Sequence, residues 1–163
     1  MQDTAIVSKI FFSKGRSNLS PEDIVNIQQY LNPVLPEELV NHYLMHNGGI
    51  PSNSFWILED GCSLWVKKFL PMKFPVGTER TLEDSYLLMV AKNVMPKALI
   101  PFAIDHGGNY FCIDTFGEVY FYAVDRWDEA LNDEQNHEKA KKKLGVSFQW
   151  FVNQLVESDE YED

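Results

Sequence analysis

Residues 99–122 have the sequence LIPFAIDHGGNYFCIDTFGEVYFY, which consists of three apolar runs separated by two turn signals. The turn signals are residues 105–109 and residues 115–118. Each contains glycine, which supplies the positive φ that tight hairpin turns need. The apolar runs are rich in Phe, Tyr, Ile and Val, which suit a pleated, half-buried surface. The pattern predicts a three-stranded antiparallel meander. Because no other stretch is so apolar, we expect the rest of the chain to pack on it.

A second pair of strands is predicted on the N-terminal side of the meander. Residues 55–58 and residues 62–70 are rich in apolar and aromatic side chains, and residues 59–61 between them form a turn signal. Residues 6–7 and 10–12 are also apolar. They are compatible with a short strand or with the packed edge of an N-terminal arm.

Four helices are predicted from their start and stop signals. Ser20, Thr81 and Ser147 can each accept a backbone N–H at a helix N-terminus, and Pro36 suits a first helical turn. Asn47 with Gly48 is expected to provide a left-handed C-terminal cap for the second helix. The predicted helices lie within residues 20–32, 36–48, 78–96 and 147–156.

Two charged segments occupy the C-terminal third of the chain. Residues 128–143 are acidic first and then basic, an order that suits the dipole of an exposed helix but is also compatible with a surface loop. Residues 157–163 form an acidic tail that is too polar to be buried and is expected to be mobile.

The order of the predicted elements indicates the fold class. Strands joined by hairpin signals and interleaved with unpaired helices are typical of an α+β fold with a single, mostly antiparallel sheet and helices packed around it. The simplest arrangement places the helices on one face of the sheet. The chain has no internal repeat and no polar linker. We therefore expect one domain over residues 1–163, with its core between about residues 20 and 157 and the acidic tail after it.

The charge of the chain narrows the class of its partners. There are 24 acidic and 14 basic residues, which gives a formal net charge of −10. This balance argues against nucleic-acid binding, because a cationic surface supplies most of the affinity there. It permits a basic protein partner, whose approach an acidic face would steer.

The chain carries no signal for a membrane or an oxidising compartment. Its apolar runs fall far short of the roughly 20 residues that span a bilayer. Its first apolar segment is interrupted by Ser8 and Lys9, so a signal peptide is rejected. The expected location is the cytoplasm. Cys62 and Cys112 lie among apolar residues and are expected to be free thiols that act as small core residues.

The sequence contains no arrangement typical of a catalytic or metal site. The meander has no nucleophile–base pair, phosphate loop or metal-ligand spacing. His42 and His46 are four residues apart, as two zinc ligands on a helix would be, but no Glu follows His42 and no third ligand is near in sequence. We expect two solvent-facing or helix-end histidines, with no metal and no cofactor.

The assembled pattern resembles the SMI1/KNR4 family, also called the SUKH superfamily, over roughly residues 20–157. The matching features occur in family order: the helix start at Leu35–Pro36, Asn47–Gly48–Gly49, LIPFA at residues 99–103, Asp105, Gly108–Asn109, FCID at residues 111–114, GEVY at residues 117–120, and Ser147–Phe148 with Phe151. The resemblance implies an α+β fold without catalytic residues. Many bacterial members look like immunity proteins that bind and neutralise polymorphic toxins, often nucleases, and fungal relatives act in cell-wall regulation. The lengthened charged segment at residues 128–143 departs from the family. It could belong to a partner-reading surface or be a plain insertion.

The leading hypothesis is a non-enzymatic module that blocks a toxin domain by covering its basic surface. The candidate acidic contacts lie at three predicted turns: Glu59, Asp60, Asp105 and Glu118. For Asp105, and for Asp114 in the next turn, hydrogen bonding to the turn backbone is the favoured role. Large aromatic residues are mostly core residues, so at most one of Trp56, Trp65, Trp127 and Trp150 is expected at an interface.

Three alternatives remain open at this point. A regulatory or scaffold protein for an endogenous partner would have the same residues. A hydrolase could use His106 as a general base beside Asp105, with Asp114 across a hairpin, but no nucleophile is near. A homodimer could form through an exposed edge of the sheet.

Overall fold

The computed structural model describes residues 10–125 and 127–157. Within them, the chain forms five helices and eight strands. In chain order these are β1 (Phe12–Ser13), α1 (Pro21–Gln28), α2 (Glu37–Met45), β2 (Ile50–Pro51), β3 (Phe55–Ile57), β4 (Ser63–Phe69), α3 (Leu82–Ala91), β5 (Ile100–Asp105), β6 (Tyr110–Ile113), β7 (Val119–Tyr122), α4 (Asp133–Ala140), β8 (Lys141–Gly145) and α5 (Phe148–Gln154).

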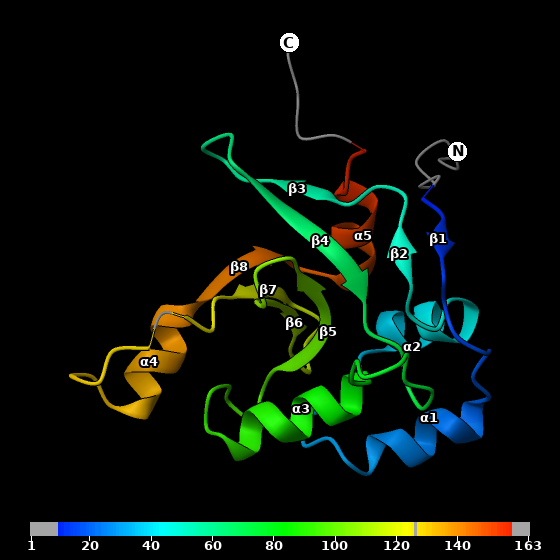
Figure 1. The fold of residues 1–163 in the computed structure, drawn as a ribbon, viewed down its shortest axis with the longest axis horizontal. Coiled ribbons are helices and arrows are strands. Elements are labelled where there is room, and N and C mark those ends of the chain that lie inside the picture. The colour runs from blue at the N-terminus through cyan, green and yellow to red at the C-terminus, as the bar shows by residue number, and fades with distance from the viewer. Residues whose placement is uncertain (1–9, 126, 158–163) are drawn as a thin grey trace.

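Six strands form one antiparallel sheet in sequence order, from β3 at one edge to β8 at the other. The predicted meander is confirmed as β5, β6 and β7, with Phe111 opposite Phe121 and Ile113 opposite Val119. The predicted strand pair is confirmed as β3 and β4. Figure 1 shows that the sheet curls, with the β3–β4 hairpin rising above the central strands. The fold is therefore α+β, with helices around a mostly antiparallel sheet.

The charged segment at residues 128–143 contains two elements. The exposed-helix alternative is confirmed by α4, which Asn132 caps by accepting the N–H of Gln135. The loop alternative is wrong, and the segment's last three lysines instead begin the edge strand β8, which was not predicted. Pairing with β7 imposes this strand, since the lysine run has no apolar alternation of its own. Lysine on an edge strand discourages pairing with another chain.

The predicted helix starts are confirmed by their hydrogen bonds. Ser20 Oγ accepts the N–H of Asp23 while Asp23 Oδ2 accepts the N–H of Ser20, which is a complete capping box. Thr81 Oγ1 and Ser147 Oγ accept the N–H groups of Asp84 and Trp150 at the starts of α3 and α5. The helices α1 and α3 end earlier than predicted, at Gln28 and Ala91, because single turns continue the chain toward each proline.

Buried side chains form two apolar clusters on opposite faces of the central strands. Along β6, Phe111 and Ile113 belong to the larger cluster, whereas Cys112 between them belongs to the smaller one. The larger cluster includes side chains of α1, α2, α3 and α5, and the smaller one includes Ala140 of α4 and Met89 of α3. The helices therefore cover both faces of the central strands, not the single face expected.

The residues after α2 are joined to the loop after β4 and to the segment before α1 by buried polar groups. The Nδ2 atom of Asn47 donates to the carbonyl oxygens of Ser17 and Met72, and its Oδ1 accepts the N–H of Met72 at 2.8 Å. Gly48 follows with φ of +77°, and a Cβ there would lie 2.8 Å from the backbone of Pro71. The left-handed residue is thus Gly48, two positions after the C-cap residue His46, which itself has an extended backbone.

The N-terminal arm forms a second, two-stranded sheet. In it, β1 pairs with β2, with Phe12 opposite Pro51, so the strand alternative is confirmed for residues 12–13. Residues 6–7, which belong to the same expectation, lie outside the described residues, as does the acidic tail after Glu157.

Candidate functional site

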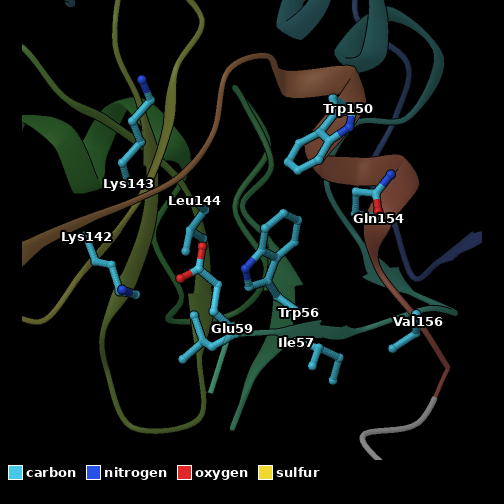
Figure 2. A pocket seen from close by; sticks show the side chains of 10 residues that line it. Trp56, Ile57, Glu59, Lys142, Lys143, Leu144, Trp150, Gln154 and Val156 are labelled. Carbon is cyan, nitrogen blue, oxygen red and sulfur yellow. The ribbon is translucent and has the colours of Figure 1, made fainter. Parts of the chain in front are cut away.

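The two edges of the curled sheet border one cleft. It has a volume of about 410 Å³ and lies between β3 with its following turn, β8 and α5. Figure 2 shows side chains from these elements facing the same space: Trp56 and Glu59 from the hairpin, Lys142 and Leu144 from β8, and Trp150 from α5. The cleft joins segments about 90 residues apart in sequence, since residues 56–59 face residues 142–156 across it.

The wall of the cleft is aromatic. Trp56 is buried and stacks on Phe151 at 5.1 Å between ring centroids, while Trp150 meets Trp56 edge-on at 5.6 Å and remains 44% exposed. Gly145 makes this arrangement possible, because a Cβ at that position would lie 2.7 Å from Trp150 Cε3. Any larger residue would displace the indole, so the glycine at the end of β8 shapes the cleft.

Both signs of charge lie along the rim. Glu59 is exposed and makes no hydrogen bond or ion pair with any residue that the structure describes. Asp60 Oδ1 accepts the N–H of Cys62 at 2.9 Å, and this hydrogen bond, helped by the nearby Lys142, lowers the pKa of Asp60. On the β8 side, Lys143 Nζ lies 2.9 Å from Glu118 Oε2. The bond from Lys143, followed by one from the Tyr120 hydroxyl, lowers the pKa of Glu118.

Of the four predicted acidic contacts, Glu59 lines the cleft. Asp60 is the next residue of the same turn, and Glu118 pairs with the lining residue Lys143. Asp105 is not among the lining residues. Its turn lies beside β4, where the ring of His106 packs at a tilt against Trp65 with 3.9 Å between ring centroids.

The carboxylates of the two meander turns are held by their own backbones. Asp105 Oδ1 accepts the N–H groups of Gly107 and Asn109, and Asp105 Oδ2 accepts Asn109 Nδ2. Asp114 Oδ1 accepts two backbone N–H groups in the same way, and its Oδ2 accepts the hydroxyl of Tyr120. The favoured turn roles of both residues are confirmed. The two carboxylates that the hydrolase hypothesis would use are thus occupied.

His42 lies in the last turn of α2, but the solvent-facing alternative is wrong for it. His42 is buried among the rings of Phe12, Phe69 and Phe148, and within the described chain its Nε2 has no hydrogen-bond partner. Burial, with a smaller contribution from His46, lowers the pKa of His42 to about 3. His46 is partly exposed at the helix end, as expected. In residues 10–125 and 127–157, no three His, Cys, Asp or Glu side chains are grouped to hold a metal ion.

Two further expectations about buried residues are corrected. Cys112 is buried in the core, but Cys62 is exposed at the end of the hairpin turn, because β3 and β4 extend beyond the helices there. Of the four tryptophans, only Trp56 is buried, whereas Trp65, Trp127 and Trp150 are 42–50% exposed. Sequence patterns missed this because apolar runs do not reveal which strand lies at the margin of a sheet.

The fold is a small α+β domain with a cleft between the two edges of its sheet. The sequence model of the SMI1 / KNR4 family (SUKH-1) matches residues 18–154, and the chain belongs to this family. No curated protein matches the chain significantly. No helix in the described part of the chain is both long and apolar enough to cross a membrane.

Proposed function

We propose that this protein is a non-enzymatic binding module of the immunity-protein type, which binds and neutralises a toxin domain in the cytoplasm. The observation that carries the proposal is the cleft between the sheet edges, which combines an exposed indole with an unpaired carboxylate. Membership of the SMI1 / KNR4 family is consistent with it.

The cleft has the composition of a binding hot spot. Tryptophan is enriched among the few residues that dominate binding energy, and Trp150 is exposed while held in place by Trp56 and Gly145. A ring that is already fixed loses little conformational entropy on binding. We assign Trp150 as the apolar anchor for a partner side chain that enters the cleft.

The hairpin turn supplies the electrostatic part of the proposed surface. Glu59 has no partner in the described chain, and Asp60 beside it is kept ionised by its turn. Nucleases bind phosphate with Arg and Lys, so such a toxin would present cations that these carboxylates can attract. Rim charges of this kind mainly change the association rate. Glu118 contributes less here because Lys143 already neutralises it, and Asp105 would act only by shaping its own turn.

The edge strands make self-association an unsuitable use of the same surface. Antiparallel pairing of two β8 strands would bring the lysines of one copy close to those of the other, which is repulsive. The other edge is partly occupied, since Phe55 exchanges backbone hydrogen bonds with Val156. We therefore favour a different protein as the partner.

The test is co-expression with the C-terminal domain of a polymorphic toxin encoded beside this protein, followed by co-purification and binding kinetics. We expect protection of the cells and a stable complex. Trp150→Ala should speed dissociation about tenfold or more. Glu59→Lys should slow association several-fold at low salt, while Glu22→Lys, an equal charge change on α1, should leave it within about twofold.

The outcomes distinguish a failure of the immunity proposal from a failure of the cleft as its binding surface. Absence of binding and of protection would overturn the immunity proposal for that toxin and favour the regulatory alternative. Binding that is insensitive to Trp150→Ala and Glu59→Lys would overturn the cleft assignment alone. Loss of protection in His106→Ala, with binding intact, would instead support the hydrolase alternative.

A further inference from the structure

A second hollow lies beside the N-terminal arm and has the opposite electrostatic character. Its volume is about 190 Å³, and it is enclosed by the arm, β2, the second half of β4 and the loop after β4. Four of its lining residues are cationic, namely Lys14, Arg16, Lys67 and Lys68. This concentration is unexpected in a chain with 24 acidic and 14 basic residues.

Most of this positive charge has no internal counterpart. Among the described residues, Glu79 is the single acidic residue that lines the hollow, and it pairs with Lys68. Lys14, Arg16 and Lys67 form no ion pair with any residue in the described ranges. Burial, and to a smaller extent repulsion from the neighbouring Lys67, lowers the pKa of Lys68. An anion in the hollow would relieve this repulsion.

The backbone holds the cations in place. Lys14 has φ of +60°, a left-handed conformation that costs a non-glycine residue of order 1 kcal/mol or more. The arm is fixed on both sides of it, by the pairing of β1 with β2 and by the bond from Arg16 N–H to the carbonyl oxygen of Asn47 at 2.9 Å. The arm precedes residue 18, where the family match begins, so these two cations lie outside the matched region.

The floor of the hollow is apolar. Ile50, Phe69, Pro71 and Val76 contribute to the lining, and within residues 10–125 and 127–157 no polar side chain other than Glu79 and the cations takes part. The hollow is smaller than the roughly 300–1,000 Å³ of drug-sized ligand sites, so its ligand must be small. Arginine binds phosphate through two parallel hydrogen bonds, and several cations together favour a doubly charged head over a single carboxylate.

We propose that this hollow binds a small phosphate monoester with an apolar body. The phosphate would lie among Lys14, Arg16 and Lys67, and the apolar body would lie over Ile50, Phe69 and Val76. This site does not depend on the proposed toxin partner, because it is formed by other residues than those of the cleft.

The test uses the full chain, titrated with phenyl phosphate, inorganic phosphate and benzoate at low salt while amide chemical shifts are followed by NMR. We expect saturable shifts around residues 14–16, 49–50 and 67–69, with phenyl phosphate binding about tenfold or more tightly than either other probe. No saturable shifts with phenyl phosphate would overturn the proposal. Equal shifts at Lys141–Lys143 would also overturn it, because they would indicate general attraction of anions to lysine.

Two variants distinguish a site from a structural role of these cations. Lys14→Gly removes a charge and also relieves the left-handed backbone, so it should weaken phenyl phosphate binding about fivefold or more while raising the unfolding midpoint. Lys67→Gln should weaken binding similarly. Lys92→Gln, which removes an exposed lysine at the end of α3, should leave the dissociation constant within about twofold. Unchanged binding in both Lys14→Gly and Lys67→Gln would overturn the assignment.

Discussion

Phe102 and Phe111 in the central strands are fully buried, whereas Phe55 and Trp65 in the β3–β4 hairpin stack on each other at the surface. Both regions are rich in apolar and aromatic residues in the sequence. They differ because helices and loops cover both faces of β5–β7, while the outer face of the hairpin has no covering element among the described residues. Position in the sheet therefore decides whether an aromatic side chain serves the core or the surface.

The carboxylates of the two regions differ in the same way. Asp105 and Asp114 each accept two backbone N–H groups, so both carboxylates of the meander turns are hydrogen-bonded within their own turns. In the hairpin turn, Asp60 accepts one backbone N–H group and Glu59 accepts none. The carboxylates at the central turns are thus bonded within the protein, whereas Glu59 at the margin of the sheet can contact another molecule.

The largest expected contrast is the loss of stability when an aromatic ring is removed from the core or from the hairpin. Phe102→Ala should lower the free energy of unfolding by about 3–5 kcal/mol, because the ring packs on Phe69, Phe148 and Phe151 and would leave a cavity. Trp65→Ala in the hairpin should cost less than about 1.5 kcal/mol, since half of that side chain is already exposed. Urea unfolding of both variants measures the contrast. Similar losses would show that the hairpin is as much a part of the core as β5.

The next contrast is the effect of pH on stability through two histidines, the buried His42 and the exposed His106. Burial holds the pKa of His42 at about 3, against 6.5 in an unfolded chain. The unfolded state therefore binds more protons between these values, so the stability is complete above about pH 6.5 and falls as the pH drops toward 3. The loss due to this residue should reach about 2 kcal/mol at about pH 5.

Urea unfolding across this pH range, with two matched variants, isolates that contribution. His42→Phe should flatten the dependence between about pH 6.5 and 5. His106→Gln, which removes the exposed ring packed against Trp65, should keep the slope of the natural chain. An unchanged slope in His42→Phe would mean that His42 is not the group responsible.

These contrasts mark the limits of prediction from sequence. The meander and the helix caps could be predicted because turn and cap chemistry is local, as in the reciprocal bonds of Ser20 and Asp23. The strand β8 could not, because it depends on register with β7 rather than on its own residues. His42 was misjudged for the same reason, since Phe12 of the distant arm completes its enclosure.

Only the acidic residues of the candidate site could be predicted from the sequence. The turn residues Glu59 and Asp60 were identifiable from their position between two strands. The cleft beside them was not, because Trp56, Gly145 and Trp150 meet only when the sheet curls. One signal was available: a glycine at residue 145 that no predicted turn required.

The smallest contrast compares carboxylates at two hairpin turns. Asp105→Ala should lower the free energy of unfolding by about 1–3 kcal/mol, because it leaves the N–H groups of Gly107 and Asn109 without their acceptor. Glu59→Ala should change it by less than about 0.5 kcal/mol, since that side chain is exposed and has no partner in the described chain. Asp105→Asn keeps an oxygen acceptor and should recover most of the loss, which separates the turn bonds from charge. If Asp105→Ala is as mild as Glu59→Ala, the carboxylate of Asp105 is available after all, and it regains its place among the candidate contacts for a basic partner.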